Sequence, residues 1–131
     1  MAEQQDAGSA AAMAGRFWMF AGLILLLRVV SLWFNNAPLF FDEAQYWVWA
    51  KEPAFGYFSK PPLLAWTIAA FTGVCGDGEF CVRLASPVLH TLTGFFVFLA
   101  GRALFDARIG LIAGIGWLLL PAVTLSSTLV S

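Results

Sequence analysis

Two adjacent carboxylates, Asp42 and Glu43, stand just after the first apolar stretch of a chain that otherwise suits a lipid environment. Acids close to a membrane lose part of their hydration, so they are more often kept for proton, metal or substrate chemistry than for stability. Neighbouring helical residues point about 100° apart. One carboxylate can therefore act as a general base while the other binds a metal or meets a cation. The structural alternative is a helix N-cap at Asp42 followed by an acidic first-turn residue.

Two basic residues follow in the same segment. Lys60 precedes Pro61-Pro62, and Arg83 lies at the mouth of the second long apolar stretch. A lysine is a compact charge on a flexible stem, so it is a good partner for a phosphate group at a membrane surface. Either residue can instead contact lipid headgroups without any catalytic role, and the sequence leaves both interpretations open.

Three further polar positions have simpler interpretations. Arg28 lies inside the first apolar stretch, and we expect its side chain to snorkel to the interface, with pairing to an acid such as Asp42 as the alternative. His90 is expected to be a hydrogen-bonding residue between packed helices. Cys75 and Cys81 flank a glycine-containing loop that would let them form a disulfide, although nothing in the sequence requires one.

The composition defines the elements that must position these groups. The chain is 60% apolar and 11% charged, with a mean hydropathy of +0.80, which is far from the balance of a soluble domain. Residues 17–34, 84–101 and 110–131 are each long enough to cross a bilayer. We therefore predict an all-α polytopic membrane protein with three transmembrane helices. The near-zero net charge gives no indication of nucleic-acid binding.

The first apolar stretch and the segment before it have different expected roles. Residues 17–34 are too long for a signal-peptide core and are not followed by an Ala-x-Ala site, so we interpret them as an uncleaved anchor. Residues 1–15 are rich in Ala, Gln, Gly and Ser, and we expect them to be disordered. The remaining residues, 16–131, are expected to form one membrane module.

The loop from 35 to 83 is expected to carry one or two helices that lie on the membrane surface. Asp42 begins a short aromatic-rich segment that ends before Pro53. Residues 63–74 are apolar and follow a proline pair, a placement that the first helical turn tolerates. They are too short to span a bilayer, so we predict an interfacial helix, with half of a re-entrant hairpin as the alternative.

Basic residues and prolines add orientation and shape. Arg102 and Arg108 lie in the short link between the second and third predicted spans, and Arg16 flanks the first. The positive-inside rule then puts the N-terminus in the cytoplasm and the 35–83 loop on the outer face. Pro87 is expected in the first turn of the second span, and Pro121 is expected to kink the third.

Taken in order, these motifs resemble the N-terminal part of polyprenyl-phosphate-sugar-dependent glycosyltransferases of the GT-C fold. Within that class the resemblance is to the protein mannosyltransferases and to the bacterial lipid A aminoarabinose transferases. It covers residues 17–131 and is carried by Asp-Glu-Ala-Gln-Tyr-Trp at 42–47, Gly-Tyr-Phe-Ser-Lys-Pro-Pro-Leu at 56–63, Gly-Asp-Gly-Glu at 76–79 and Val-Arg-Leu at 82–84.

The resemblance implies inverting transfer of a sugar from a polyprenyl-phosphate donor to a hydroxyl of a lipid, protein or glycan acceptor. The expected place is the outer face of the bacterial inner membrane. Asp42 matches the position that deprotonates or orients the acceptor, and Glu43 matches its partner. Lys60 matches a lysine that meets the lipid phosphate, and Arg83 would add a second positive charge there.

The remaining implied features concern the lining of the site and its cofactors. Tyr46, Trp47 and Tyr57 are candidates to line the sugar or isoprenoid. Ser59 stands where the aminoarabinose transferases have an acid before the lysine, so the resemblance does not extend to a metal site that uses that acid or to the acceptor of those enzymes. No cofactor is assigned, and a divalent-metal requirement stays open.

Members of this family are much longer and have many more spans. We therefore expect these 131 residues alone to be inactive, either as a fragment of a larger enzyme or as a truncated reading frame. The alternative function is a small non-enzymatic membrane protein that binds lipid phosphate or a partner complex. An ion-translocating subunit is disfavoured because the predicted spans lack the buried acids that such a path needs.

Overall fold

The computed structural model describes residues 2–34, 39, 41–57 and 62–126, and within these ranges every regular element is an α-helix. The all-α prediction is therefore confirmed for the described part of the chain. The helices are α1 (Ala2–Trp33), α2 (Phe41–Lys51), α3 (Leu63–Cys75), α4 (Glu79–Leu104), α5 (Ala107–Leu119) and α6 (Pro121–Ser126).

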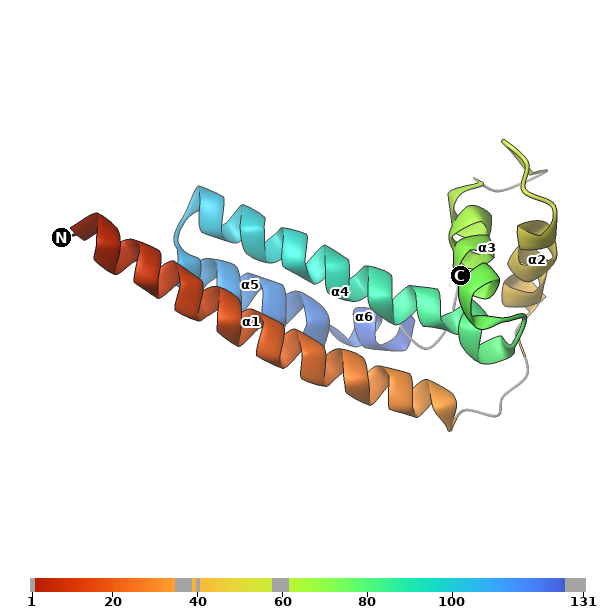
Figure 1. The fold of residues 1–131 in the computed structure, drawn as a ribbon, viewed down its shortest axis with the longest axis horizontal. Coiled ribbons are helices and arrows are strands. Elements are labelled where there is room, and N and C mark those ends of the chain that lie inside the picture. Colours follow the sequence, from red (N-terminus) through yellow and green to blue (C-terminus); the bar gives the residue numbers. More distant parts are fainter. Residues whose placement is uncertain (1, 35–38, 40, 58–61, 127–131) are drawn as a thin grey trace.

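Three helices form an elongated bundle, and two shorter ones cross its end. Helices α1, α4 and α5 run side by side, while α2 and α3 stand across the long axis, beyond the C-terminal end of α1 (Figure 1). Two helices of the described chain, Gly8–Trp33 and Glu79–Leu104, are long and apolar enough to cross a membrane. The predicted count of three spans is not confirmed.

The third predicted span is divided. Helix α5 has 13 residues, so it rises only about 20 Å, which is less than the thickness of a hydrocarbon core. Leu120 then adopts extended backbone angles (φ −56°, ψ 132°), because a residue before proline avoids the helical region. Helix α6 begins at Pro121. The predicted kink is thus an interruption between two helices.

Two other helix boundaries differ from the sequence prediction. Helix α4 begins at Glu79 rather than Leu84, so Pro87 lies inside the helix and not in its first turn. Since proline has no N–H, the carbonyl of Arg83 loses its helical partner. Helix α1 begins at Ala2, so the expected disorder of residues 1–15 is not what the structure describes. Alanine has the highest helix propensity, and this segment is rich in it.

Glycines set the contact between α4 and α5. A Cβ atom added to Gly110 would lie 2.6 Å from the carbonyl oxygen of Phe98, and one added to Gly101 would lie 2.8 Å from the Cα of Gly110. Small residues thus let the two backbones approach closely. Phe17 of α1 packs over this contact, with its ring 5.2 Å from that of Phe98.

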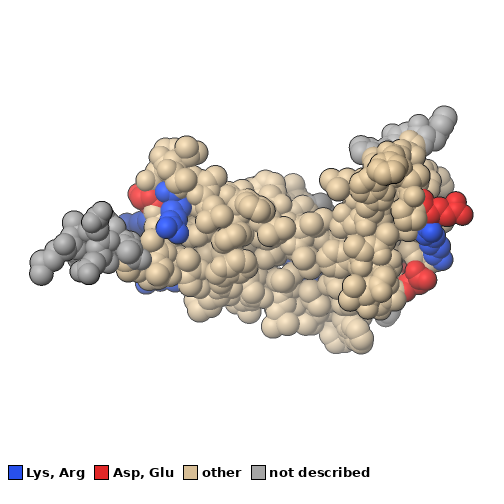
Figure 2. Space-filling model, turned by 45° about the horizontal axis from the view of Figure 1, so that its top comes forward, with Lys and Arg blue, Asp and Glu red and all other residues tan. Residues whose placement is uncertain are grey.

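The outer surface of the bundle is apolar. In the 18-residue apolar stretch of each long helix, only 11% of the residues of α1 and 28% of those of α4 are buried inside the structure, so most of their apolar side chains face outwards. Figure 2 shows charged groups at the two ends of the molecule and an uncharged surface between them on the face in view. This distribution suits a lipid environment, because a lipid-facing band must be free of charge.

Candidate functional site

Helix α2 presents its two acids in different directions. Asp42 and Glu43 both lie in its first turn, and the helix already begins at Phe41, so Asp42 is within the helix rather than at its cap. Asp42 is exposed to solvent, whereas Glu43 is 1% exposed. The expected divergence of adjacent helical side chains therefore separates one accessible carboxylate from one buried carboxylate.

Glu43 is buried in an ion pair with Arg83 of α4. The Nε of Arg83 donates to Oε1 of Glu43 at 3.0 Å, and its Nη2 donates to Oε2 at 2.7 Å. Two parallel charge-assisted bonds compensate the loss of hydration of both groups. Arg83 is 2% exposed, so its guanidinium is directed to Glu43 and is not open to solvent. The structure thus shows Arg83 as the partner of Glu43, and the phosphate contact that the sequence suggested stays a prediction.

Tyr46 belongs to the core beneath α2 and also borders a groove. It is 6% exposed and packs in a small apolar cluster that joins α2 to α3 and α4, formed by Tyr46, Ala50, Ile68 and Val82. An apolar groove of about 400 Å³ opens beside it and is lined by Tyr46, Leu63, Leu64, Thr67 and Leu89. A groove of this character suits an aliphatic or isoprenoid chain.

Tyr57 packs against the C-terminal end of α2, and Trp47 contacts Lys51 within that helix. The hydroxyl of Tyr57 lies 2.8 Å from the carbonyl oxygen of Trp49 and accepts the N–H of Ala54 at 3.1 Å. Its ring stacks on that of Trp49 at 4.7 Å. The ammonium of Lys51 lies 3.9 Å from the centre of the Trp47 ring, which is a cation–π contact. The Tyr57 contacts hold the end of α2, and the sugar-lining role of Tyr57 and Trp47 stays a prediction.

A disulfide joins α3 to α4. Cys75 at the end of α3 is bonded to Cys81 in the first turn of α4, with their Cα atoms 5.9 Å apart. The chain turns between them through Gly76, whose φ of +101° is accessible to glycine at little cost. The bridge that the sequence left open is present, and it fixes α3 close to Arg83.

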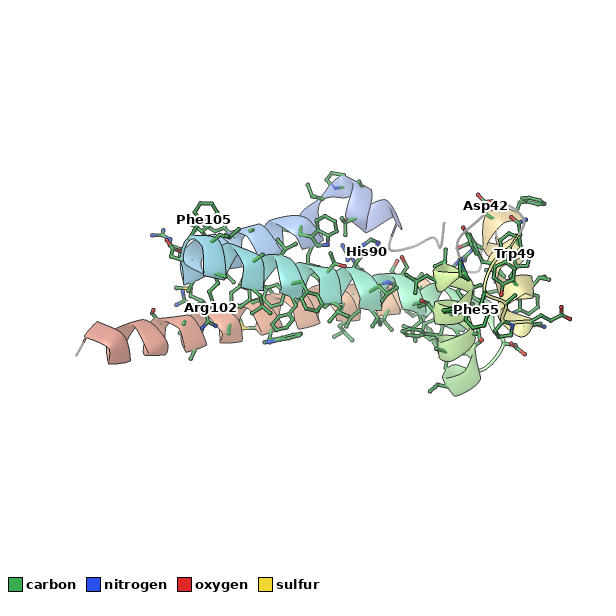
Figure 3. All side chains as sticks on the ribbon, turned by 90° about the horizontal axis from the view of Figure 1, so that it is seen from above. Asp42, Trp49, Phe55, His90, Arg102 and Phe105 are labelled. Carbon is green, nitrogen blue, oxygen red and sulfur yellow. A yellow bond between two sulfur atoms is a disulfide. The ribbon has the colours of Figure 1, made fainter. Side chains whose placement is uncertain are left out.

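Lys60 lies outside the described residues, so the hypothesis that it faces the same pocket as Asp42 stays a prediction. Across residues 2–34, 39, 41–57 and 62–126, no group of three or more His, Cys, Asp or Glu side chains gathers as a metal site. Figure 3 shows Asp42, Trp49 and Phe55 together at one end of the molecule and Arg102 and Phe105 at the other.

Sequence reasoning missed the actual position of Arg28. Its side chain turns into the bundle, where Nη2 donates to the carbonyl oxygen of Leu118 at 2.6 Å. It therefore neither snorkels outwards nor pairs with Asp42. The available signal was Pro121, because a helix that ends before a proline leaves carbonyls of its last turn without helical donors.

The fold and this site define a helical membrane protein that presents a carboxylate on a short helix across the end of its bundle. A family model described as "Dolichyl-phosphate-mannose-protein mannosyltransferase" matches residues 59–131, more than half of the chain. The chain belongs to this family. The resemblance drawn from the motifs is thereby confirmed, and its members are glycosyltransferases of the GT-C type that use polyprenyl-phosphate sugar donors.

The chain is also similar to a curated bacterial protein. It is 35% identical over 117 residues to "Lipid A galacturonosyltransferase RgtD" from Rhizobium johnstonii (strain DSM 114642 / LMG 32736 / 3841). The matched region covers 85% of this chain and 25% of the relative, so the chain spans about a quarter of the length of that protein. No solved structure gives a significant match.

Proposed function

We propose that this chain supplies the acceptor-activating part of a glycosyltransferase that moves a sugar from a polyprenyl-phosphate donor to a hydroxyl group on the outer face of the membrane. The observation that carries the proposal is the pairing of an exposed Asp42 with a buried, charge-compensated Glu43 on one short helix. Family membership supports the donor class.

Asp42 is assigned the role of general base. As the acceptor oxygen bonds to the anomeric carbon, its proton passes to the Asp42 carboxylate, and the bond from that carbon to the phosphate oxygen breaks on the opposite face. The configuration inverts, and the phosphate stays on the polyprenyl chain. Lys60 offsets the negative charge that grows on this leaving group. A placed base of this kind contributes roughly 10²–10⁴-fold in rate.

Arg83 is assigned a positioning role in place of direct phosphate binding. Its two bonds to Glu43 tie the first turn of α2 to α4, and that turn carries Asp42. The apolar groove beside Tyr46 is the proposed binding site for the first isoprene units of the donor. Tyr57 and Trp47 are proposed to contact the sugar of the donor.

The proposed orientation puts the N-terminus in the cytoplasm and α2 and α3 on the outer surface of the bacterial inner membrane. Two observations support it. Arg102 is at the opposite end of the bundle from Asp42 (Figure 3), as the positive-inside rule requires. The Cys75–Cys81 disulfide at the Asp42 end suits an oxidising compartment.

The first acceptor to examine is lipid A, and the first sugar is galacturonic acid, because these are named for the curated relative. Membranes that contain the full-length protein are incubated with polyprenyl-phosphate galacturonic acid and lipid A, and the product is followed by mass spectrometry. A parallel reaction with a chelator determines whether a divalent metal is needed.

The decisive variant is Asp42→Asn, with Glu52→Gln as the matched control because Glu52 is an exposed acid just after the same helix. Asp42→Asn should lower transfer about 10²–10⁴-fold while donor affinity is unchanged. Glu52→Gln should keep the wild-type rate. Wild-type transfer by Asp42→Asn would remove Asp42 from the mechanism and overturn the proposal.

A further inference from the structure

Arg28 is a charged side chain enclosed by the bundle. It is 7% exposed, and Nη2 donates to the carbonyl oxygen of Leu118 at 2.6 Å and to Oγ1 of Thr124 at 3.4 Å. Both acceptors are neutral. In the part of the chain that the structure describes, Nη1 has no hydrogen-bond partner. A guanidinium with this surrounding needs an anion, because a buried charge without a counter-charge is costly.

A groove beside Arg28 has room for such an anion. It encloses about 320 Å³ between α1 and the end of α5 with the start of α6, and Arg28 forms part of its wall. Leu27 and Leu119 on its rim are each 61% exposed, so the groove opens to the outside of the bundle. Its other walls are two aliphatic and two hydroxyl-bearing side chains: Ile24, Leu118, Ser31 and Thr124.

We propose that Arg28 binds the phosphate group of a membrane lipid whose apolar chain lies along the exposed leucines of this groove. The planar guanidinium fork matches phosphate oxygens, and the hydroxyl of Ser31 can donate to the same group. The aliphatic walls favour a lipid over inorganic phosphate, since a free ion would leave them uncovered. The site is independent of sugar transfer, because neither Asp42 nor Glu43 lines this groove.

The occupant that competes with this lipid is a carboxylate from another membrane segment. A carboxylate would satisfy the charge of Arg28 equally well. It would not, however, make the affinity of the protein for a lipid depend on a phosphate group. The preference for a phosphorylated lipid over its alcohol therefore separates the two occupants.

The experiment uses the 131-residue chain purified in a neutral detergent and native mass spectrometry as the readout. A short-chain phosphatidic acid (the monophosphate), the matching diacylglycerol (the alcohol) and inorganic phosphate are the probes; a diacyl lipid is used because the proposed donor site is expected to bind a polyprenyl phosphate. The monophosphate should bind at least about tenfold more tightly than the alcohol, as expected of a charge-assisted hydrogen bond. Inorganic phosphate should not displace it at equal concentration.

Arg28→Gln should reduce this preference to about one while alcohol binding stays unchanged. Arg102→Gln is the matched control, because Arg102 is an exposed arginine at the far end of α4, and it should keep the preference. A preference that survives Arg28→Gln, equal binding of monophosphate and alcohol by the wild type, or full displacement by inorganic phosphate would each overturn the proposal.

If circular dichroism shows that Arg28→Gln does not fold, a second variant tests the same site. In Ser31→Ala/Thr124→Ala the arginine is kept and two hydroxyls of the groove are removed. Weaker binding of the monophosphate with unchanged binding of the alcohol supports the site. Unchanged binding of both lipids overturns it.

Discussion

Replacing Glu43 by Gln should destabilise the attachment of α2 far more than replacing its neighbour Asp42 by Asn. Both changes turn a carboxylate into an amide on the same helical turn. Glu43 accepts two short bonds from Arg83, and both side chains are about 2% exposed or less. Asp42 is exposed, so its replacement leaves no buried charge behind.

The magnitude follows from this geometry. Hydrogen bonds to charged groups contribute roughly 1.5–3 kcal/mol each, and breaking a buried ion pair from one side costs about 3–5 kcal/mol because the other charge stays buried. Asp42→Asn should change the free energy of unfolding by about 0.5 kcal/mol or less, as surface substitutions usually do.

Hydrogen exchange in detergent micelles measures the destabilisation of α2 at the amides of that helix. Since about 1.4 kcal/mol corresponds to a factor of ten, the protected amides of α2 should exchange roughly 10²–10⁴-fold faster in Glu43→Gln. Amides in the middle of α4 and α5 serve as the internal reference. Equal exchange of α2 in the Asp42→Asn and Glu43→Gln variants would refute the claim that the buried pair holds this helix.

Two further predictions concern the contact between α4 and α5 and the disulfide between α3 and α4. Gly110→Ala should destabilise the bundle by a few kcal/mol, roughly the cost of overpacking, because its new methyl group would meet backbone atoms of Phe98 and Arg102. Gly116→Ala is the control: its methyl group would meet nothing within 4 Å, so it should stabilise the bundle by up to about 1 kcal/mol. Denaturant titration followed by circular dichroism compares them, and a smaller loss for Gly110 than about 1 kcal/mol would contradict the close contact. Cys75→Ala should lower the free energy of unfolding by about 2 kcal/mol, since the disulfide closes a short loop with a sequence separation of 6. Mild reduction of the wild type should cause the same loss. An unchanged denaturation midpoint in both experiments would show that the disulfide does not stabilise the fold.

The elements of the fold were accessible from the sequence because they depend on local patterns. The segments around Asp42 and after Pro62 are helices as predicted, since apolar spacing and proline placement are local signals. The start of α4 was placed too late because Glu79 and Arg83 made its first turns look like loop. These charges are tolerated there because Arg83 finds a partner in α2, which is a tertiary fact.

Only part of the candidate site could be predicted from the sequence, because its central contact is a tertiary one. The sequence identified Asp42 and Glu43 as a pair that faces two ways, and it identified Arg83 as a cation at the mouth of the second span, with a lipid phosphate or lipid headgroups as its expected partner. It did not show that Arg83 and Glu43 bind each other, because their contact joins residues 40 positions apart. A phosphate ligand and a buried carboxylate are equally good partners for an arginine when only residue types are known.

The structure accounts for why an acid pair, rather than a single acid, opens this short helix. A helix of 11 residues is not stable alone in water, so α2 must be held by tertiary contacts if Asp42 is to have a fixed position. A carboxylate that holds the helix must be buried, whereas one that accepts a proton from a substrate must be reachable. Adjacent positions about 100° apart meet both demands within one turn. Glu43 therefore fixes the helix through Arg83, and its solvent-exposed neighbour Asp42 has the accessibility that the proposed general base requires.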